Sequence, residues 1–302
     1  MRYEFVTCDV FTDTRFGGNQ LAVLPEASGL TADQMQQVAR EFNFSESTFV
    51  LPPEQPGHDR RVRIFTPARE VPFAGHPNVG TAFALAASGR LGEVAAPVTV
   101  QFEEAAGIVA VRIEPRGPGR FWCELRAPEP FTRGRALPVE LVAAAVGLAP
   151  EALRTEAHAP VVASVGLPFV IAELTDPGAL ARARPDTAAL ERLAALTGIT
   201  PDVHLYTRAD PGTGLDLQAR MFAPFDGVPE DPATGSANGA LAGLLASVDP
   251  PAGGVAAWRI GQGIEMGRPS LLAARVRMAG AHVSDVWIGG ESVLVSEGVL
   301  TV

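Results

Sequence analysis

The 302-residue sequence contains no lysine, because all 24 of its basic residues are arginines. A lysine forms the Schiff base to pyridoxal phosphate, and a lysine also holds the nucleotide in the phosphate-binding loop of P-loop enzymes. Lysine-based aldolases and decarboxylases likewise need this side chain as their nucleophile. The composition therefore excludes these three kinds of site from this chain.

Cysteines, long apolar runs and positive charge are also scarce. Cys8 and Cys123 fall in strand-like segments, which predicts buried thiols rather than a disulfide framework or a metal site. No apolar stretch approaches the roughly 20 residues of a membrane helix, and the N-terminus lacks the features of a signal peptide. The net charge of −10 and the pI near 5.0 argue against nucleic acid or an anionic membrane as a partner. We therefore expect a cytoplasmic protein.

The motifs of three common enzyme classes are missing. The five histidines are scattered and form no H-E-x-x-H pattern, which argues against a metalloenzyme. The stretch GSANG has the wrong spacing for the G-x-S-x-G motif of serine hydrolases. The stretch GQGIEMG has the wrong spacing for a dinucleotide-binding loop, and we interpret it as a tight turn.

The sequence repeats itself about half a chain apart. Residues 76–82 read HPNVGTA and residues 231–237 read DPATGSA, with His76 and Asp231 at their heads, 155 positions apart (231 − 76). The preceding stretches, VRIFTP at 62–67 and ARMFAP at 219–224, also match. This pattern predicts a duplicated domain in which each copy runs from strand to loop to a helix that opens at the heptapeptide. At this spacing Glu46 pairs with Pro201, so the second copy has no matching carboxylate.

Alternating strand-like segments dominate both halves, which favours an α+β fold. Helical patterns occur at 31–42 and 187–198, and short strands are expected at 47–52 and 202–208. We predict a first domain at 1–128 and a second at 129–286, with a linker near 127–137. The last strand, 287–302, is expected to return to the first domain.

The start of each predicted helix offers unpaired backbone N–H groups and a partial positive charge, which suit a carboxylate ligand. Glycines there let a ligand approach the backbone, and a hydroxyl adds a donor. The candidate substrate-binding residues at the two starts are Gly75, Gly80, Thr81, Gly235 and Ser236. If the halves face one cleft, His76 and Asp231 suit acid–base chemistry on a small anionic substrate. The structural alternative is that Asp-Pro and His-Pro simply begin helices.

A third segment supplies another candidate acid. Residues 43–49 read NFSESTF and place Glu46 where a helix gives way to a strand. In an apolar site between Phe44, Phe49 and Phe73, a raised pKa would let this carboxyl act as base and then as acid. The alternative is a solvated loop acid or part of a capping pattern.

Taken together, five motifs resemble the PhzF-like, phenazine-biosynthesis family. They are GGNQLAVLP, NFSESTFV, TPAREVPFAGHPNVGTA, DPATGSANGALA and GQGIEMGRPS, and the resemblance runs from about residue 3 to the end. It implies a diaminopimelate-epimerase-like fold of two pseudo-symmetric domains, each a barrel-like, mostly antiparallel sheet around a central helix. It also implies a homodimer and no cofactor, and the scattered histidines give no reason to expect a metal.

The same resemblance implies an isomerase that acts on trans-2,3-dihydro-3-hydroxyanthranilate, in which a glutamate moves a proton between ring carbons. Glu46 matches that glutamate, and His76, Asp231 and Ser236 match further polar site residues. Asn19 matches a turn asparagine of the site. The amides around Gly75 and Gly235 would hold polar or anionic substrate groups.

Three alternatives remain open on the sequence. The substrate could be another unsaturated or amino-acid-like carboxylate, since a fold does not determine a substrate. A non-catalytic binding or interaction protein could keep the same cleft. An epimerase or racemase with one cysteine per half is disfavoured, because Cys8 and Cys123 lie outside both heptapeptides.

Overall fold

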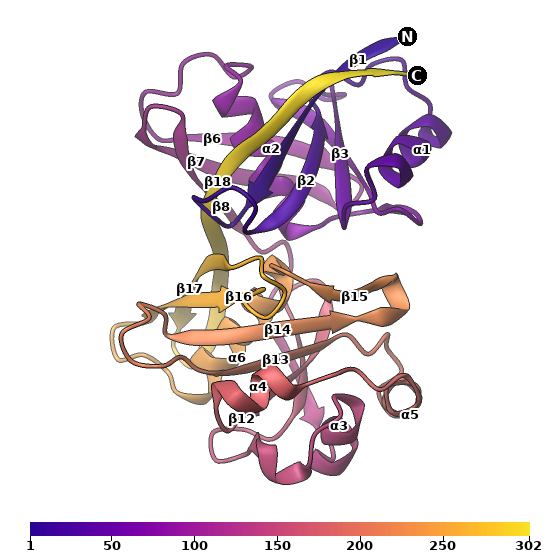
Figure 1. Cartoon of the computed structure of the whole chain (residues 1–302). Helices are drawn as coiled ribbons and strands as arrows, with labels where there is room; N and C mark the ends of the chain where they lie inside the picture. The colour runs from indigo at the N-terminus through magenta and orange to yellow at the C-terminus, as the bar shows by residue number, and fades with distance from the viewer. The chain divides into compact units, whose positions relative to one another are not determined.

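The computed structural model describes residues 1–302, except for the side chain of Asp226. The chain forms two compact units. Unit 1 consists of Met1–Arg126 with Gly289–Val302, and unit 2 consists of Ala127–Ile288. The long final strand β18 (His282–Thr301, yellow in Figure 1) crosses this boundary, so its last part belongs to unit 1.

The strands of unit 1 close into a ring, and each one pairs with the next. In ring order they are β1 (Arg2–Val10), β2 (Asn19–Leu24), β3 (Glu46–Leu51), β4 (Arg60–Phe65), β6 (Val98–Glu104), β7 (Gly107–Gly117), β8 (Arg120–Arg126) and β18, which pairs with both β8 and β1. The β2–β3 and β4–β6 pairs are parallel, whereas β1–β2, β3–β4, β6–β7, β7–β8 and β1–β18 are antiparallel. The α+β class with a barrel-like sheet is therefore confirmed.

Helix α2 (Gly75–Ala87) is the central helix of this ring, and it is buried from Gly75 to Ala86. Apart from His76 and Asn78 in its first turn, its sequence, GHPNVGTAFALAA, consists of apolar or small residues, as expected for a helix enclosed by strands. A Cβ atom on Gly80 would lie 2.5 Å from a Leu21 methyl carbon and 2.6 Å from a Val10 methyl carbon. Packing against the barrel wall therefore requires this glycine, which corrects its prediction as a ligand-approach residue.

Helix α1 (Ala32–Phe42) lies outside the ring and matches the helix predicted at 31–42. The Thr31 side chain accepts a hydrogen bond from the Gln34 backbone, and the Gln34 side chain bonds back to Thr31, which forms a capping box. Asn43 ends the helix in a left-handed conformation. The chain then turns directly into β3, and this turn places Glu46 at the first position of that strand.

Unit 2 repeats the same plan around helix α6 (Gly235–Val248). Its strands are β9 (Thr132–Ala136), β10 (Leu153–Arg154), β11 (Val161–Ser164), β12 (Pro168–Leu174), β13 (Val203–Arg208), β14 (Leu217–Ala223), β15 (Val228–Asp231), β16 (Val255–Gln262) and β17 (Ser270–Ala279). They pair in the order β9–β11–β12–β13–β14–β16–β17, with β10 on β12 and β15 on β14. Strand β9 occupies part of the predicted linker at 127–137, because it pairs with β11 of unit 2.

The outer helices of unit 2 are α3 (Val139–Ala145), α4 (Pro177–Arg182) and α5 (Thr187–Thr197), together with the short 3₁₀ helices η1 (Pro150–Ala152) and η2 (Pro224–Asp226). Residues of α3, α4 and α5 form one apolar cluster with β12 and β13. Helix α5 matches the prediction at 187–198, with Asp186 as its N-cap and Gly198 ending it in a left-handed conformation.

The strand registers correct the predicted partner of Glu46. In unit 1, Ser47 of β3 pairs with Phe65 of β4, and in unit 2, Val203 of β13 pairs with Phe222 of β14. Phe65 and Phe222 are matching residues of the repeat, so Ser47 matches Val203. The residue that matches Glu46 is therefore Asp202, not Pro201, and both copies carry a carboxylate at this position.

The registers also correct the pairing of the two heptapeptides. Val71 of β5 (Glu70–Val71) pairs with Ile64, and Asp231 pairs with the matching Met221, so Asp231 corresponds to Val71. Asp231 follows Phe222 by nine residues, whereas Val71 follows Phe65 by six, so the second copy has three extra residues in this hairpin.

The helix starts complete the corrected alignment. Helices α2 and α6 begin at Gly75 and Gly235, so Ser236, rather than Asp231, corresponds to His76. The amides of Asn78 and Asn238 make the same bond to the backbone oxygen four residues earlier, at 3.0 and 2.9 Å. The likeness of HPNVGTA and DPATGSA therefore does not mark equivalent positions.

Candidate active site

Three of the predicted residues gather at the start of α2 in unit 1. His76 lies in the first turn of α2, and its Nε2 atom is 3.5 Å from Oε2 of Glu46. Its other ring nitrogen, Nδ1, is 3.3 Å from Nδ2 of Asn19, the first residue of β2. The parallel pairing of β2 with β3 supports this arrangement, because it sets Leu21 beside Glu46.

The imidazole of His76 is held in its neutral form. The residue is 5 % exposed, and burial lowers its pKa from 6.5 to about 3, against the opposing effect of a hydrogen bond with the Gln20 backbone. Nε2 is buried without a hydrogen-bond partner among the described residues. At neutral pH its contact with Glu46 is therefore not an ion pair, and 3.5 Å is longer than an ordinary hydrogen bond.

The Glu46 carboxylate contacts His76 and is also partly exposed, so that a substrate can reach it. Its side chain is 19 % exposed, whereas that of His76 is 5 % exposed. The N-cap residue of α2, Ala74, has no side-chain oxygen, so it cannot cap the first N–H groups of this helix. A half-buried carboxylate and a set of backbone donors thus occur at one helix start, where Gly75 is the first residue.

Thr81 does not lie at this helix start. It is fully buried in the second turn of α2, and its hydroxyl oxygen lies 2.8 Å from that of Thr48 in β3. This hydrogen bond ties the helix to the barrel wall. The prediction of Thr81 as a substrate-binding hydroxyl is thereby corrected, since the side chain is used within the core, as Gly80 is.

In unit 2, Asp231 ends β15 four residues before α6 begins at Gly235, and Ser236 follows in the first turn. Thr234 is the N-cap residue, yet it forms no side-chain cap for its own helix. Its hydroxyl instead donates to Oδ2 of Asp231. The N-cap residue of α6, like that of α2, therefore forms no side-chain cap.

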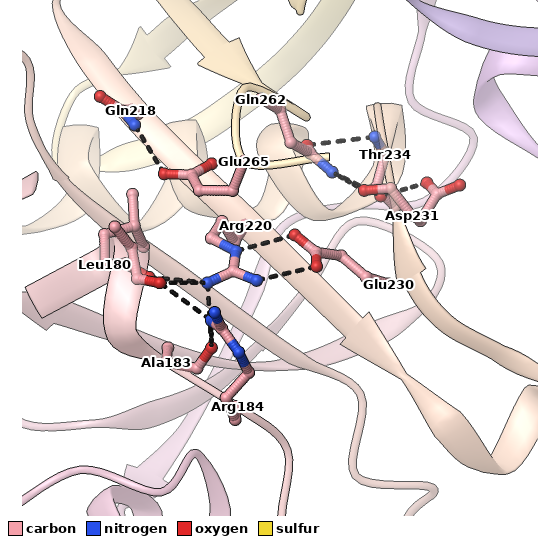
Figure 2. A network of polar contacts seen from close by, with 11 residues as sticks. Leu180, Ala183, Arg184, Gln218, Arg220, Glu230, Asp231, Thr234, Gln262 and Glu265 are labelled. Atoms are coloured by element: carbon pink, nitrogen blue, oxygen red, sulfur yellow. Dashed lines mark hydrogen bonds and ion pairs between the residues drawn. The ribbon is translucent and has the colours of Figure 1, made fainter. Parts of the chain in front are cut away.

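The sequence did not predict two polar residues that lie beside Asp231 and Thr234 in unit 2. Gln262, at the end of β16, is fully buried and bonds to Asp231 and Thr234, as Figure 2 shows. Asn238 lies one turn into α6 and bonds to Gln262. The signal for Asn238 was present, because an asparagine stands four residues after each N-cap. Gln262 had no such signal, because its contacts join segments about 30 residues apart.

Both cysteines lie in unit 1, Cys8 in β1 and Cys123 in β8, where they are buried free thiols with raised pKa values caused by burial. The predicted buried thiols are confirmed, and the units do not carry one cysteine each. Among the described residues, no three His, Cys, Asp or Glu side chains gather as metal ligands would. No helix in the described part of the chain has both the length and the apolar character to span a membrane.

The family model of the phenazine biosynthesis-like proteins matches residues 8–298. The chain belongs to this family. A trans-2,3-dihydro-3-hydroxyanthranilate isomerase of Pseudomonas aeruginosa is 37 % identical over 296 residues, which cover 98 % of each chain. An uncharacterized isomerase of Mesorhizobium japonicum is 39 % identical over 302 residues, again 98 % of each chain.

Among solved structures, the Bacillus anthracis phenazine biosynthesis protein of the PhzF family superposes with a TM-score of 0.90 at 25 % identity, over all of both chains. The names of these relatives agree with an enzyme of the isomerase class, and this phenazine biosynthesis-like protein is an isomerase. The catalytic interpretation is confirmed over a purely binding role.

Proposed function

We propose that this isomerase moves a proton within a small unsaturated carboxylate of the kind named for its P. aeruginosa relative, trans-2,3-dihydro-3-hydroxyanthranilate. One observation carries the proposal: the half-buried carboxylate of Glu46 lies beside a buried ring nitrogen of His76 that has no hydrogen-bond partner among the described residues. A buried polar atom without a partner costs free energy, and it is retained where a ligand can satisfy it.

Glu46 is the proposed proton carrier. It removes a proton from the carbon next to the unsaturated system, the electron pair spreads over that system, and the proton is returned at its far end. One C–H bond breaks and another forms, so the substrate is neither oxidised nor reduced. General acid–base catalysis of this kind typically contributes about 10²–10⁴-fold to a rate.

His76 has a different proposed role, because a ring with a pKa of about 3 does not hold a second proton at neutral pH. Its neutral imidazole has one N–H donor and one acceptor nitrogen. Nε2 therefore serves as a polar contact for Glu46 and for the substrate. Because the ring carries no charge, it does not hold the Glu46 carboxylate in an ion pair. Asn19, which lies 3.3 Å from Nδ1, orients the ring.

The backbone N–H groups at the start of α2, where the N-cap residue Ala74 forms no side-chain cap, are the proposed partners of the substrate carboxylate, since a helix start favours an anion. In unit 2, Asp231, Gly235 and Ser236 stay predicted site residues for the same reaction. The homodimer also stays a prediction.

The proposal is tested with trans-2,3-dihydro-3-hydroxyanthranilate in D₂O, followed by proton NMR, with wild type, Glu46→Gln and Glu41→Gln. Glu41 is a matched control, because it is an exposed glutamate in α1 only five residues away. We expect Glu46→Gln to lose at least about 10³-fold in turnover, with deuterium entering the product only where turnover occurs. Glu41→Gln should match wild type.

Turnover by Glu46→Gln close to that of wild type would contradict the assignment of Glu46. A wild-type protein without activity on this compound would contradict the proposed substrate. In that case the same exchange assay is applied to other unsaturated and amino-acid-like carboxylates, where dependence on Glu46 again tests the residue separately from the substrate.

A further inference from the structure

The end of β16, the turn that follows it and the start of β17 (residues 261–270, which include GQGIEMG) pack directly against the residues that follow Asp231. The Ser270 hydroxyl donates to the Pro232 carbonyl at 2.8 Å. A Cβ atom on Gly263 would lie 2.7 Å from that same carbonyl oxygen, and the residue has a positive φ of 73°. Glycine is thus required at this position, where the turn closes on the segment leading into α6.

Gln262 lies at the centre of this contact and uses every hydrogen-bonding position of its amide. Nε2 donates to the backbone oxygen of Asp231 at 2.7 Å and to the hydroxyl of Thr234 at 3.1 Å. Oε1 accepts from the Asn238 amide at 2.7 Å and from the Thr234 backbone N–H at 3.2 Å. Figure 2 shows Gln262 pointing from its strand toward Thr234 and Asp231.

Together with the His204 ring, these contacts determine which group donates and which accepts in each hydrogen bond. The neutral His204 ring lies 3.2 Å from Oδ1 of Asn238, which orients that amide so that its nitrogen faces Gln262. Thr234 accepts from Gln262, so its single hydroxyl hydrogen is available for Oδ2 of Asp231. The result is an ordered chain from His204 through Asn238, Gln262 and Thr234 to Asp231.

We propose that Gln262 is a positioning residue that, through Thr234, holds the Asp231 side chain in one orientation and in its ionised form. A hydroxyl that donates to a carboxylate stabilises the charged form. The same arrangement turns the Thr234 hydroxyl away from its own helix, so this N-cap residue forms no side-chain cap for α6. The consequence for catalysis rests on the proposed function, whereas the state of Asp231 does not.

Other charged or titratable groups lie around this chain of hydrogen bonds. Glu230 precedes Asp231, but its carboxylate is paired with Arg220 through two hydrogen bonds of 2.7 and 2.8 Å. Glu265, in the turn, accepts from Gln218 at 2.8 Å, and Arg268 follows that turn. His204 is buried in β13, and burial lowers its pKa to about 4, so it is neutral at pH 7.

The test uses the full chain with ¹³C-labelled aspartate and follows the carboxyl carbon of Asp231 by NMR as the pH is varied, with its signal assigned through Asp231→Asn. Thr234→Val keeps the shape of the side chain but removes the hydroxyl, and Thr234→Ser keeps the hydroxyl. Gln262→Met removes the amide, and Gln218→Met is its control on the neighbouring strand β14.

We expect the titration midpoint of Asp231 to rise by about one pH unit in Thr234→Val and Gln262→Met, because the donor to the carboxylate is lost or free to rotate. Thr234→Ser and Gln218→Met should keep the wild-type midpoint. With an active substrate, kcat should fall roughly tenfold to a hundredfold in the first two variants, and the acid limb of the pH profile should move with the midpoint.

An unchanged midpoint in Thr234→Val or in Gln262→Met would overturn the proposal, and so would equal shifts in Thr234→Val and Thr234→Ser. If Gln262→Met does not fold, the threonine pair still decides whether the Thr234 hydroxyl holds the Asp231 carboxylate. A wild-type chain with no turnover would refute the proposed function, yet the NMR midpoints would still decide whether Gln262 and Thr234 hold Asp231 as described.

Discussion

Glu104, the last residue of β6, combines an ionisable group with unusual burial. Both of its carboxyl oxygens are buried and have no hydrogen-bond partner among the described residues. Burial raises its pKa from 4.5 to about 8, and the nearby Asn78 amide offsets part of this effect. The folded protein therefore keeps Glu104 protonated at pH 7, whereas the unfolded chain ionises it.

The size and sign of the effect follow from this difference. Since the folded pKa lies above the unfolded one, the folded state binds the extra proton between pH 4.5 and about 8. The free energy of unfolding falls as the pH rises through this interval. At about 1.4 kcal/mol per pH unit, the loss reaches up to about 5 kcal/mol by pH 8.

Glu104→Gln keeps a neutral side chain of the same shape at every pH. We expect the variant to match wild type near pH 4.5 and to become progressively more stable than wild type up to about pH 8, with no further gain above it. The assay is equilibrium urea unfolding of both proteins at several pH values from 4.5 to 9, with the free energies compared at each pH.

The neighbouring Glu103 provides a control of opposite sign, because successive residues of a strand point to opposite faces. Its carboxylate accepts hydrogen bonds from the Glu54 and Gln55 backbones and contacts His58, all at 2.7 Å, and the first of these contributes most to lowering its pKa. Its stabilising effect is present above the unfolded pKa and is lost on acidification.

Glu103→Gln should therefore be less stable than wild type at pH 7, and this deficit should shrink as the pH falls. A stability difference between Glu104→Gln and wild type that does not vary with pH would refute the reasoning about Glu104. It would show that this carboxyl titrates alike in the folded and unfolded chains.

Three further predictions concern His76, Gly80 and the matching arginines Arg63 and Arg220. The ring of His76 should remain neutral from pH 8 to pH 5, with a titration midpoint near pH 3 by NMR. The free energy of unfolding should fall as the pH drops from 6.5 toward 3, because the unfolded chain binds the proton first. A midpoint near 6.5 would contradict the effect of burial on this ring. Gly80→Ala should destabilise the protein by about 1–3 kcal/mol in thermal unfolding, because its Cβ meets barrel side chains, whereas Gly253→Ala, with open space around it, should change little. Arg220→Met breaks the ion pair with Glu230, whose arginine is 4 % exposed, and should lower the free energy of unfolding by about 3–5 kcal/mol. Arg63→Met breaks the matching pair of unit 1, whose arginine is 19 % exposed, and should lower it by about 1 kcal/mol or less. Equal losses in these two arginine variants would contradict the role assigned to burial.

Local signals in the sequence predicted much of the fold. Helices at 31–42 and 187–198 appear as α1 and α5, because their caps at Thr31 and Asp186 act within a few residues of the helix start. The strands expected at 47–52 and 202–208 appear as β3 and β13 within one residue. Short-range hydrogen bonds and alternating burial are properties of the local chain, so a single sequence displays them.

The misread positions all depend on partners that are distant along the chain. The similarity of the two heptapeptides paired His76 with Asp231. The strand registers instead align Asp231 with Val71, and they align Asp202 with Glu46. Thr81 looked like a site hydroxyl but bonds to Thr48 in the core. An insertion in a hairpin shifts the spacing without changing the register, so only the paired strands reveal it.

The sequence by itself determined the family, the α+β duplication and the residue types available for acid–base chemistry, because motifs and periodicity are written along the chain. The tertiary structure alone decided which of these residues meet. It brought Glu46 to 3.5 Å from a neutral, buried His76, and it placed Gln262 against Asp231 and Thr234. Burial and hydrogen bonds between distant segments set the ionisation and orientation of a side chain, and these appear only after each sheet packs around its helix.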